Sequence, residues 1–472
     1  MASKQDLVVI GGGAGGLVVA SVAAQVGLKT TLIEKTGLLG GDCLHTGCVP
    51  SKTLIHLAHT AHVARTGVQD GLLSGATQVN FGAVIDRVQA VIAKIQLHDD
   101  PERFRSYGCD VRFGGAQFLN PRQVSVAGEI ITGKRFVIAT GSHPAIPPIP
   151  GLEEAGYDTN ESIFTRRELP ARLVIIGAGA IGVELAQAFA RLGSEVTVVE
   201  MATRILPLED AQAAAVLQEV LEAEGVTVVT AAGVTSVRRD GDSRQLLLAD
   251  NSTLECDRIL VATGRRPSLD GLGLESAGVD VARGGITVDR RLRSSQRHIY
   301  AVGDVCGPYQ FTHMAEYQAG IALANIVFRI PRKTDYRVWP RVVFTDPEVA
   351  QVGLTEAAAQ ELNISYHVTQ FPVAEVDRAI TEGAQHGFAK ILVGSRGRII
   401  GASLIGPHAG ELIHELALAM SVNARAKTIA GLVHAYPTHA QIHRRAVNKQ
   451  YAHLLQSGKV RFLAKLMNRL LP

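Results

Sequence analysis

Two cysteines, Cys43 and Cys48, are the residues whose type and spacing most clearly predict chemistry. Five positions along a helix are about one and a half turns, so a slightly distorted first turn could bring the two sulfurs to bonding distance, ~2.05 Å. A structural disulfide or half of a metal site are the alternatives. The five cysteines and the absence of a secretory signal argue against the first. No second Cys or His pair at a metal-binding spacing is found, so we predict a redox-active pair and no metal site.

A glycine-rich turn lies upstream of the cysteines. Residues 7–10 form an apolar run typical of a buried parallel strand, and a GxGxxG turn and a small-residue helix over 17–26 follow. These glycines permit the turn, the approach of a pyrophosphate and close helix packing. The next strand, 30–33, leads into an acid suited to an adenosine ribose. The predicted dinucleotide contacts are Gly11, Gly13, Gly16 and Glu34.

The redox stretch follows this first nucleotide site directly, so its dinucleotide should bring a redox ring to the cysteines, and we interpret it as a flavin. A helix that begins near Cys43 would point its N-terminal dipole at the thiolate and lower a thiol pKa from ~8.5 toward neutrality. Lys52, one turn after Cys48, is predicted to place a positive charge against the flavin. The alternative for Lys52 is a solvated helix lysine.

The opening pattern repeats later in the chain. Residues 173–176 read as a strand, a second GxGxxG turn leads into a helix up to Ala190, and a strand over 195–199 ends on an acid. That acid would repel a 2′-phosphate, so we expect NAD(H) and not NADP(H), with Arg204 as the one nearby cation that could offset it. The predicted contacts are Gly177, Gly179, Gly182 and Glu200. Glu184 is a candidate partner for Lys52, the alternative being an ordinary helix-surface acid.

Two similar strand ends flank this second site. A strand over 131–139 ends at Ala-Thr-Gly, a proline-rich crossover over 143–150 follows, and Ala-Thr-Gly recurs at 262–264, as in a duplicated fold. A strand from Ile299 then delivers an acid at its C-terminal end, where open α/β sheets hold ligands. The helix that begins at 312–315 could turn its amides toward the flavin. The predicted flavin contacts here are Thr140, Gly141, Asp304 and Ala315, and Gly264 belongs to the nucleotide-binding set.

Composition limits the class of protein. The chain has 472 residues, 46% of them hydrophobic, 48 glycines and a net charge of +3, which leaves room for about three domains and shows no bias toward nucleic acid. No run of ~18 apolar residues and no signal peptide are present, so we expect a cytoplasmic protein. Cys109, Cys256 and Cys306 are interpreted as small buried residues.

The order of these motifs resembles the class I pyridine nucleotide-disulfide oxidoreductases, the family of dihydrolipoamide dehydrogenase and mercuric reductase. The resemblance implies an α/β fold with two nested Rossmann-like dinucleotide-binding domains and a C-terminal α+β dimerisation domain. It also implies FAD, NAD(H) and a homodimer, with Cys43 as the interchange thiol and Cys48 as the charge-transfer thiol. The implied domains are 1–145 with 266–336 for FAD, 146–265 for NAD(H), and 337–472 for the interface with a basic C-terminal tail.

One segment departs from the family pattern. Where disulfide-reducing members have a histidine before a proline and a glutamate five residues later, this chain has Tyr436 and Gln441. A phenol with a pKa of ~10 is a poor base at pH 7, so Tyr436 is interpreted as a hydrogen-bond donor or a metal-facing oxygen. A tyrosine near the thiols is similar to mercuric reductase, although the C-terminal cysteine pair of that enzyme is absent. If another base serves, His45 or His439 is the first candidate, each with a helix-surface histidine as the alternative.

Three functions remain open on the sequence. The first is an NADH-dependent flavoenzyme that reduces a soft metal or another electron acceptor through Cys43 and Cys48. The second is a dihydrolipoamide dehydrogenase with a non-standard base, and the third is a flavoprotein redox sensor without steady-state turnover. Residues 442–472 carry seven cations and no acid, with a helical pattern from Lys459 that could lie on an anionic membrane or pack on the dimer.

Overall fold

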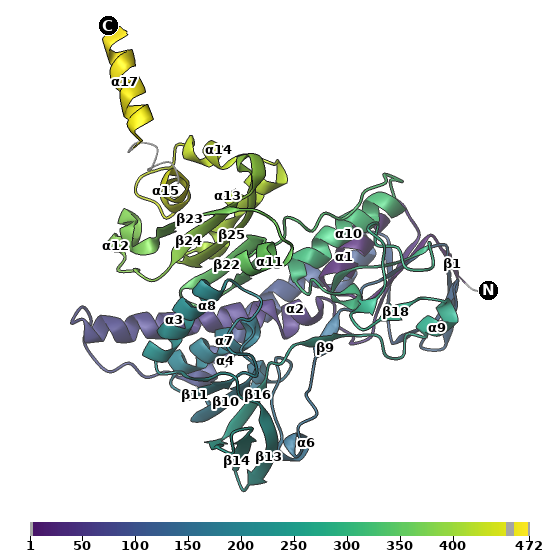
Figure 1. The fold of residues 1–472 in the computed structure, drawn as a ribbon. Coiled ribbons are helices and arrows are strands. Elements are labelled where there is room, and N and C mark those ends of the chain that lie inside the picture. Colours follow the sequence, from purple (N-terminus) through teal and green to yellow (C-terminus); the bar gives the residue numbers. More distant parts are fainter. Residues whose placement is uncertain (1–2, 450–456, 471–472) are drawn as a thin grey trace. The chain divides into compact units, whose positions relative to one another are not determined.

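The computed structural model describes residues 3–449 and 457–470, and Figure 1 shows its ribbon. The chain forms two compact units. One consists of the chain up to Gly177 with Arg191–Ser194 and Val234–Asp335, and the other of Ala178–Ala190, Glu195–Gly233 and the chain from Tyr336. The predicted α/β class is confirmed, since helices accompany parallel sheets. The division into three domains with the boundaries given above stays a prediction.

A five-stranded parallel sheet, in the order β20-β8-β2-β3-β4, carries the first glycine turn. Both faces of β2 are buried. Leu7 and Val9 pack with residues of α1 and α10, whereas Val8 and Ile10 pack with a smaller sheet. This explains the continuous apolar run at residues 7–10. The elements are β2 Leu7–Ile10, α1 Ala14–Gln25, β3 Thr30–Glu34, β4 Cys109–Phe113, β8 Phe136–Ile138, β20 Ile299–Ala301 and α10 Thr312–Ile326.

The single strand expected over 131–139 is wrong. The chain forms β7 in the small sheet β1-β7-β6-β5, leaves it at Lys134 and Arg135, and then enters β8 of the parallel sheet. The turn brings Gly133 so close to the Phe136 ring that a Cβ on the glycine would lie 2.7 Å from it. Two charged side chains in sequence also cannot continue a strand buried on both faces. The small sheet comprises β1 Ser3–Gln5, β5 Ala116–Asn120, β6 Gln123–Val126 and β7 Glu129–Gly133.

The two crossovers next to the Ala-Thr-Gly strand ends pair with each other. Strand β9, Ser142–Pro144, runs antiparallel to β17, Arg265–Pro267. The proline-rich stretch expected to be only a linker thus begins as a strand. Beyond it, β10 Arg172–Ile176 pairs parallel with β16 Arg258–Val261. The other elements of this unit are α2 Gly41–His45, α3 Cys48–Gln69, α4 Phe81–Gln96, α5 Pro101–Ser106, α6 Leu152–Ala155, β13 Val234–Asp240, β14 Ser243–Leu248, β15 Thr253–Cys256, α9 Leu274–Ala277, β18 Val281–Ala282 and β19 Gly285–Ile286.

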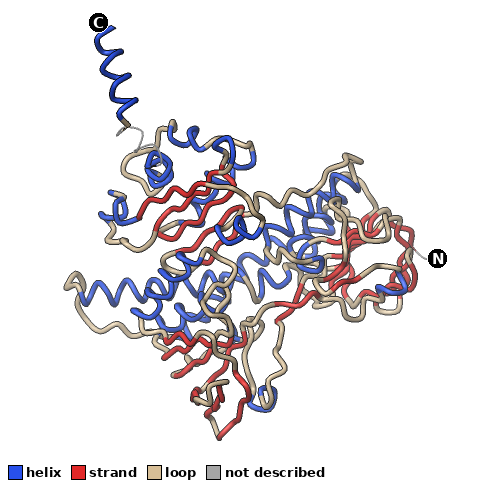
Figure 2. The backbone as a smooth tube through the Cα atoms, viewed as in Figure 1, coloured by secondary structure: helices blue, strands red, loops and turns tan. Residues whose placement is uncertain are grey.

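The second unit contains a nucleotide-type segment and an antiparallel sheet. Strands β11 Glu195–Val199 and β12 Thr227–Val229 are parallel and accompany α7 Ala180–Leu192 and α8 Ala211–Ala223. The five-stranded antiparallel sheet, drawn in red in Figure 2, has the order β21-β22-β25-β24-β23. Helix α13 packs on β21, β22 and β25, and α15 packs on β23 and β24. The bounds are β21 Pro340–Val343, β22 Glu348–Gly353, α11 Glu356–Glu361, β23 His367–Pro372, α12 Asp377–Thr381, β24 Phe388–Val393, β25 Ile399–Gly406, α13 Ala409–Ser421, α14 Ala426–Ala430, α15 Gln441–Lys449 and α17 Gly458–Leu470.

Candidate active site

The two cysteines lie on two separate helices. Cys43 belongs to α2, and Cys48 is the first residue of α3. The slightly distorted turn expected between them is a full break. Thr46 ends α2 with a non-helical φ of −138°. Its N–H still makes the last helical bond, to the Asp42 carbonyl at 2.9 Å, and its hydroxyl donates to the Asp42 carboxylate at 2.7 Å. Gly47 follows in a non-helical conformation and precedes α3.

Cys43 is half-buried and Cys48 is exposed. The Cys43 thiol hydrogen-bonds with Cys48, and this bond together with burial raises the pKa of Cys43 above its ordinary value. The expectation of a lowered thiol pKa is therefore wrong for Cys43. The helix whose N-terminus meets a thiol is α3, which begins at Cys48. The structure brings the two thiols into contact, and their oxidation to a disulfide stays a prediction.

The N-terminus of α10 lies at this pair. The hydroxyl of Thr312, the first residue of α10, is 3.4 Å from the Cys48 sulfur. Ala315, one turn later, is buried at 8% exposure. A Cβ on Gly303 would meet the Ala315 methyl at 3.2 Å, so the turn after β20 and the first turn of α10 pack tightly. The contacts of Ala315 and Asp304 with the flavin stay predictions.

A hydrogen-bonded ionic network connects the redox stretch to two strand ends. Arg265 lies 3.2 Å from the carboxylate of Asp42, donates to the Ser142 hydroxyl at 2.7 Å, and lies 3.9 Å from Asp304. Ser142 in turn donates to Asp304 at 2.6 Å. Burial raises the pKa of Asp304 above its ordinary value, although the Ser142 hydrogen bond and Arg265 oppose the rise. The sequence analysis singled out Asp304 but not Asp42 or Arg265. Asp42 precedes Cys43 and Arg265 follows Gly264, and this proximity to two predicted site residues was the signal that could have identified them.

The first glycine turn has the form that a pyrophosphate requires. Gly11 has φ +108°, and a Cβ on Gly16 would lie 1.9 Å from the Gly11 carbonyl, so neither position accepts a side chain. At Gly13 the nearest protein atom to an added Cβ is 3.8 Å away, which leaves that backbone open to a ligand. Glu34 fixes the turn, since it accepts the N–H groups of Gly12 at 2.7 Å and Thr36 at 2.8 Å. The donor set fits a dinucleotide.

The second turn repeats this chemistry. Gly177 has φ +104°, and no atom lies within 4 Å of a Cβ placed on Gly179. Glu200 accepts the N–H groups of Ala178 at 2.7 Å and Ala202 at 2.8 Å, as Glu34 does in the first turn. Gly182 lies in the first turn of α7. The residues predicted for this site thus lie on a turn of the expected kind, which fits NAD(H).

Arg204, the cation that could have offset Glu200, has its guanidinium turned to the backbone. It donates to the carbonyls of Leu206 at 2.6 Å, Pro207 at 2.8 Å and Glu209 at 3.0 Å. These bonds hold both Nη groups, so a two-pronged pairing of the guanidinium with a phosphate would have to break some of them. Arg204 is therefore a structural residue of its own loop.

Lys52 and Glu184 are both withdrawn from full solvent. Lys52 lies on α3, one turn after Cys48, and is partly buried. Glu184 is only 4% exposed, so the surface-acid alternative is wrong, and it accepts the N–H of Phe344 at 2.8 Å. After β8, Thr140 donates to the Ser268 carbonyl at 2.8 Å, and Gly141 has φ +69°. Gly264 has φ +118° and an open Cβ position. The pairing of Lys52 with Glu184 stays a prediction.

The segment that carries Tyr436 is held at both ends by one acid. Glu415 of α13 bonds His434 at 3.2 Å and His443 at 2.9 Å, one on each side of the segment. Burial alone would raise the pKa of Glu415, but the bonds and charges of the two histidines outweigh it and lower that pKa. Tyr436 itself is 70% exposed. The buried side-chain oxygen of Gln441 has no hydrogen-bond partner among the described residues, so it does not orient Tyr436 by accepting a hydrogen bond.

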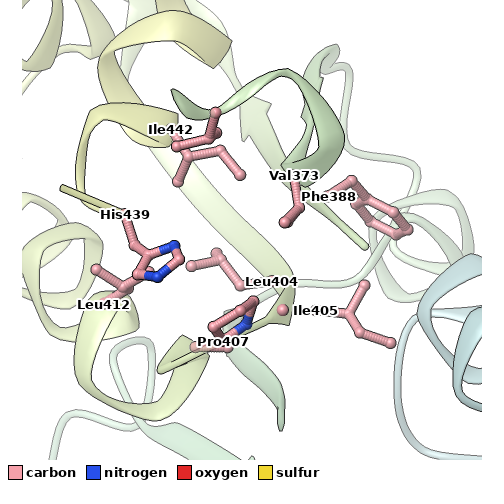
Figure 3. Close-up of a pocket in the computed structure, with 11 residues that line it drawn as sticks. Val373, Phe388, Leu404, Ile405, Pro407, Leu412, His439 and Ile442 are labelled. Carbon is pink, nitrogen blue, oxygen red and sulfur yellow. The ribbon is translucent and has the colours of Figure 1, made fainter. Parts of the chain in front are cut away.

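His439 lies at an apolar pocket beside this segment. Its ring faces a hollow lined by Val373, Phe388, Leu404, Leu412 and Ile442, as Figure 3 shows. Its Nε2 is 2.7 Å from Glu382, and its ring lies 5.6 Å from that of His408. His45 bonds the Leu39 carbonyl at 2.9 Å. Neither is a free surface histidine, and His439 with Glu382 has the form of a base with an orienting acid.

The remaining cysteines are structural. Burial raises the pKa of the Cys109 and Cys256 thiols to about 11, and both residues are buried as predicted. Burial raises the pKa of Cys306 to about 12, although part of that residue reaches the surface. In residues 3–449 and 457–470 no group of three or more His, Cys, Asp or Glu side chains could hold a metal ion. Within the same ranges no helix is both long and apolar enough to cross a membrane.

Comparison with known families assigns the chain. Residues 5–319 match the pyridine nucleotide-disulphide oxidoreductases, and residues 339–447 match the dimerisation domain of the same group. The chain therefore belongs to the pyridine nucleotide-disulphide oxidoreductase family, and the resemblance drawn from its motifs is confirmed. The cofactors of this family are FAD and NAD(H), and the dimerisation domain supports a homodimer.

Individual relatives differ in activity. Dihydrolipoyl dehydrogenase 2, mitochondrial, of Arabidopsis thaliana is 36% identical over 461 residues, covering 94% of this chain and 90% of that protein. Mercuric reductase of Bacillus cereus is 34% identical over 420 residues, covering 88% of this chain and 66% of that enzyme. The structure of the HOCl-induced flavoprotein disulfide reductase RclA from Escherichia coli in complex with Cu(II) is similar, with a TM-score of 0.85 and 30% identity over 95% of this chain and 99% of that one.

Proposed function

We propose that this protein is an NADH-dependent flavoprotein reductase whose Cys43–Cys48 disulfide hands electrons to an acceptor that needs little general-base help. FAD, when bound, supplies the ring that takes the hydride of NADH and passes the electron pair to the disulfide. The electron pair breaks the S–S bond and leaves two sulfurs, of which Cys43 faces the acceptor and Cys48 the flavin. The contact between the two thiols and the start of α3 at Cys48 support this assignment.

We base the choice of acceptor on the residue at position 436, which is a tyrosine. Tyr436 and Gln441 stand where disulfide-reducing members have a histidine and a glutamate, so the pair lacks both the base and its orienting acid. A soft metal ion can take electrons without a proton being removed from a thiol substrate. One NADH then reduces two Cu(II) to Cu(I), or one Hg(II) to Hg(0), and yields NAD⁺ and one proton. The likeness to a mercuric reductase and to a reductase crystallised with Cu(II) supports this branch.

The second nucleotide turn favours NADH over NADPH. Glu200 is fixed by two backbone N–H groups, and Arg204 is bound to three backbone carbonyls. A 2′-phosphate would therefore meet a fixed carboxylate with no free cation from Arg204. We assign Lys52, with Glu184 as its partner, to the positive charge beside the flavin.

A dihydrolipoamide dehydrogenase is the second candidate, favoured by the His439–Glu382 pair and by the 36% identity to a plant dihydrolipoyl dehydrogenase. In that case NADH and a proton reduce a lipoyl disulfide to a dithiol, with His439 as the acid that donates a proton to the leaving sulfur, and His439 is the base when the reaction runs in reverse. His439→Gln would then abolish lipoamide turnover yet leave metal reduction intact. The same substitution would leave both activities unchanged if His439 only packs against its pocket.

One set of assays separates the candidates. We would measure steady-state NADH oxidation by the holoenzyme with Cu(II), Hg(II), a soluble quinone, lipoamide and glutathione disulfide. Rapid turnover with a metal or quinone and slow turnover with lipoamide is the expected result. Lipoamide as the best acceptor would overturn it, and no turnover with any acceptor would leave a redox sensor. A cytoplasmic location and a peripheral membrane contact of the tail, which would bring a lipid-soluble quinone within reach, are part of the proposal.

A further inference from the structure

The C-terminal helix α17, Gly458–Leu470, presents an apolar and a cationic surface to solvent. Each of its residues is exposed. Six large apolar side chains are among them, with exposed fractions of 39 to 69%. These are Val460, Phe462, Leu463, Leu466, Met467 and Leu470. An exposed apolar set of this size on one helix calls for a binding partner.

Most of the apolar and cationic side chains lie on opposite faces, with Lys459 in the first turn on the apolar side and Phe462 at the border. Leu463, Met467 and Leu470 recur at helical spacing on one face, as the sequence pattern predicted. Arg461, Lys465 and Arg469 are four residues apart and share the other face, and residues 442–472 contain no acid. The partner must therefore offer an apolar layer and negative charges side by side.

Helix α17 lies outside the segment that matches the dimerisation domain of the family. The match to the dimerisation domain ends at residue 447, and α17 begins at Gly458. The helix has 13 residues, which at 1.5 Å rise per residue gives about 20 Å, less than the ~30 Å apolar layer of a bilayer. It is too short to span a membrane and has the form of a helix that lies in its surface.

We propose that α17 binds peripherally to membranes rich in anionic phospholipid. The apolar face enters the boundary between headgroups and acyl chains, and the cations contact the headgroup phosphates. A second copy of the helix fits less well, because pairing the apolar faces would bring together two helices with four cations each and no acid. This proposal does not depend on the acceptor proposed above.

The test is sedimentation of the full-length holoenzyme with vesicles of phosphatidylcholine alone or mixed with phosphatidylglycerol. A cation adds roughly a factor of five near an anionic surface, so we expect at least ~100-fold tighter binding to the mixed vesicles. The triple variant Arg461→Gln/Lys465→Gln/Arg469→Gln should lose this preference. Leu463→Ser/Met467→Ser should lose binding to both vesicles.

A matched control removes the same charge elsewhere. Arg87, Arg238 and Arg239 are exposed, and their joint substitution by Gln should leave vesicle binding unchanged. All variants should keep NADH oxidation with a soluble acceptor, which separates failure of this proposal from failure of the proposed function. Retained vesicle binding after deletion of residues 457–472 would overturn the proposal. The proposal would also be overturned if the parent protein bound no vesicles. If, in addition, light scattering showed that the deletion dissociates the dimer, α17 would pack on a second copy of the chain.

Discussion

Glu200 should make the enzyme discriminate strongly against NADPH. Its two carboxylate oxygens accept the N–H groups of Ala178 and Ala202 at 2.7 and 2.8 Å, so the charge cannot turn away from the ribose position. At about 5 Å and an effective dielectric constant near 20, two unit charges repel by roughly 3 kcal/mol, and a 2′-phosphate carries nearly two charges. Screening by salt at this partly exposed site reduces the total repulsion between the carboxylate and the 2′-phosphate, and about 3 kcal/mol of it remains. The ratio of kcat/KM for NADH over NADPH should therefore be ~100 or more.

The assay compares both nucleotides with one soluble acceptor in the wild type and in Glu200→Gln. The variant removes the charge and keeps one acceptor oxygen, so the ratio should fall to ~10 or below, with a smaller loss for NADH. Glu222→Gln is the matched control, because this exposed acid of α8 changes the net charge equally and binds only Gln218 in the helix. Comparable rates with NADH and NADPH in the wild type would refute the reasoning. An equal change in Glu222→Gln would show that net charge, and not the position of Glu200, sets the preference.

Three further predictions concern the redox pair and the Tyr436 segment. Two-electron reduction should give a long-wavelength charge-transfer band that Cys48→Ser abolishes and Cys43→Ser keeps; loss in Cys43→Ser would reverse the two roles. Lipoamide turnover should be ~100-fold below that of a His/Glu enzyme, and Tyr436→His with Gln441→Glu should restore part of it; an ordinary wild-type rate would contradict this. The lowered pKa of Glu415 means that its carboxylate stabilises the fold above pH ~4.5 and loses this effect as the pH falls through the folded pKa. Urea unfolding should show Glu415→Gln less stable by about 1–3 kcal/mol at pH 7, with a gap that begins to narrow below pH ~4.5 and keeps narrowing as the pH falls further, whereas a pH-independent gap would refute it.

The sequence predicted best those elements whose pattern arises from local burial. The strands at 7–10 and 195–199 have the expected bounds. The first is a continuous apolar run before a glycine turn, and the second is a valine-rich segment that ends before an acid. The C-terminal helix was likewise visible from its spacing and spans Gly458–Leu470. These features depend on residues within about one turn or strand of each other.

What the sequence did not predict depends on partners distant in the chain. At the break between Cys43 and Cys48 the Thr46 hydroxyl bonds Asp42, and Asp42 pairs with Arg265 from a strand 223 positions later. No local pattern indicates that pair. The prediction of one strand over 131–139 was wrong because the apolar residues before Lys134 and those after Arg135 belong to different sheets. Periodicity cannot tell one buried strand from two that meet at a turn.

The attachment of His434 and His443 to Glu415 has a consequence for how such an enzyme could change its substrate. Glu415 holds the backbone segment through His434 and His443, and neither histidine is one of the two positions that differ from the family pattern. Residues 436 and 441 can therefore exchange a phenol and an amide for an imidazole and a carboxylate without loss of the anchors. In this arrangement the chemistry of the segment can evolve through two side chains, while the fold that presents them stays constant.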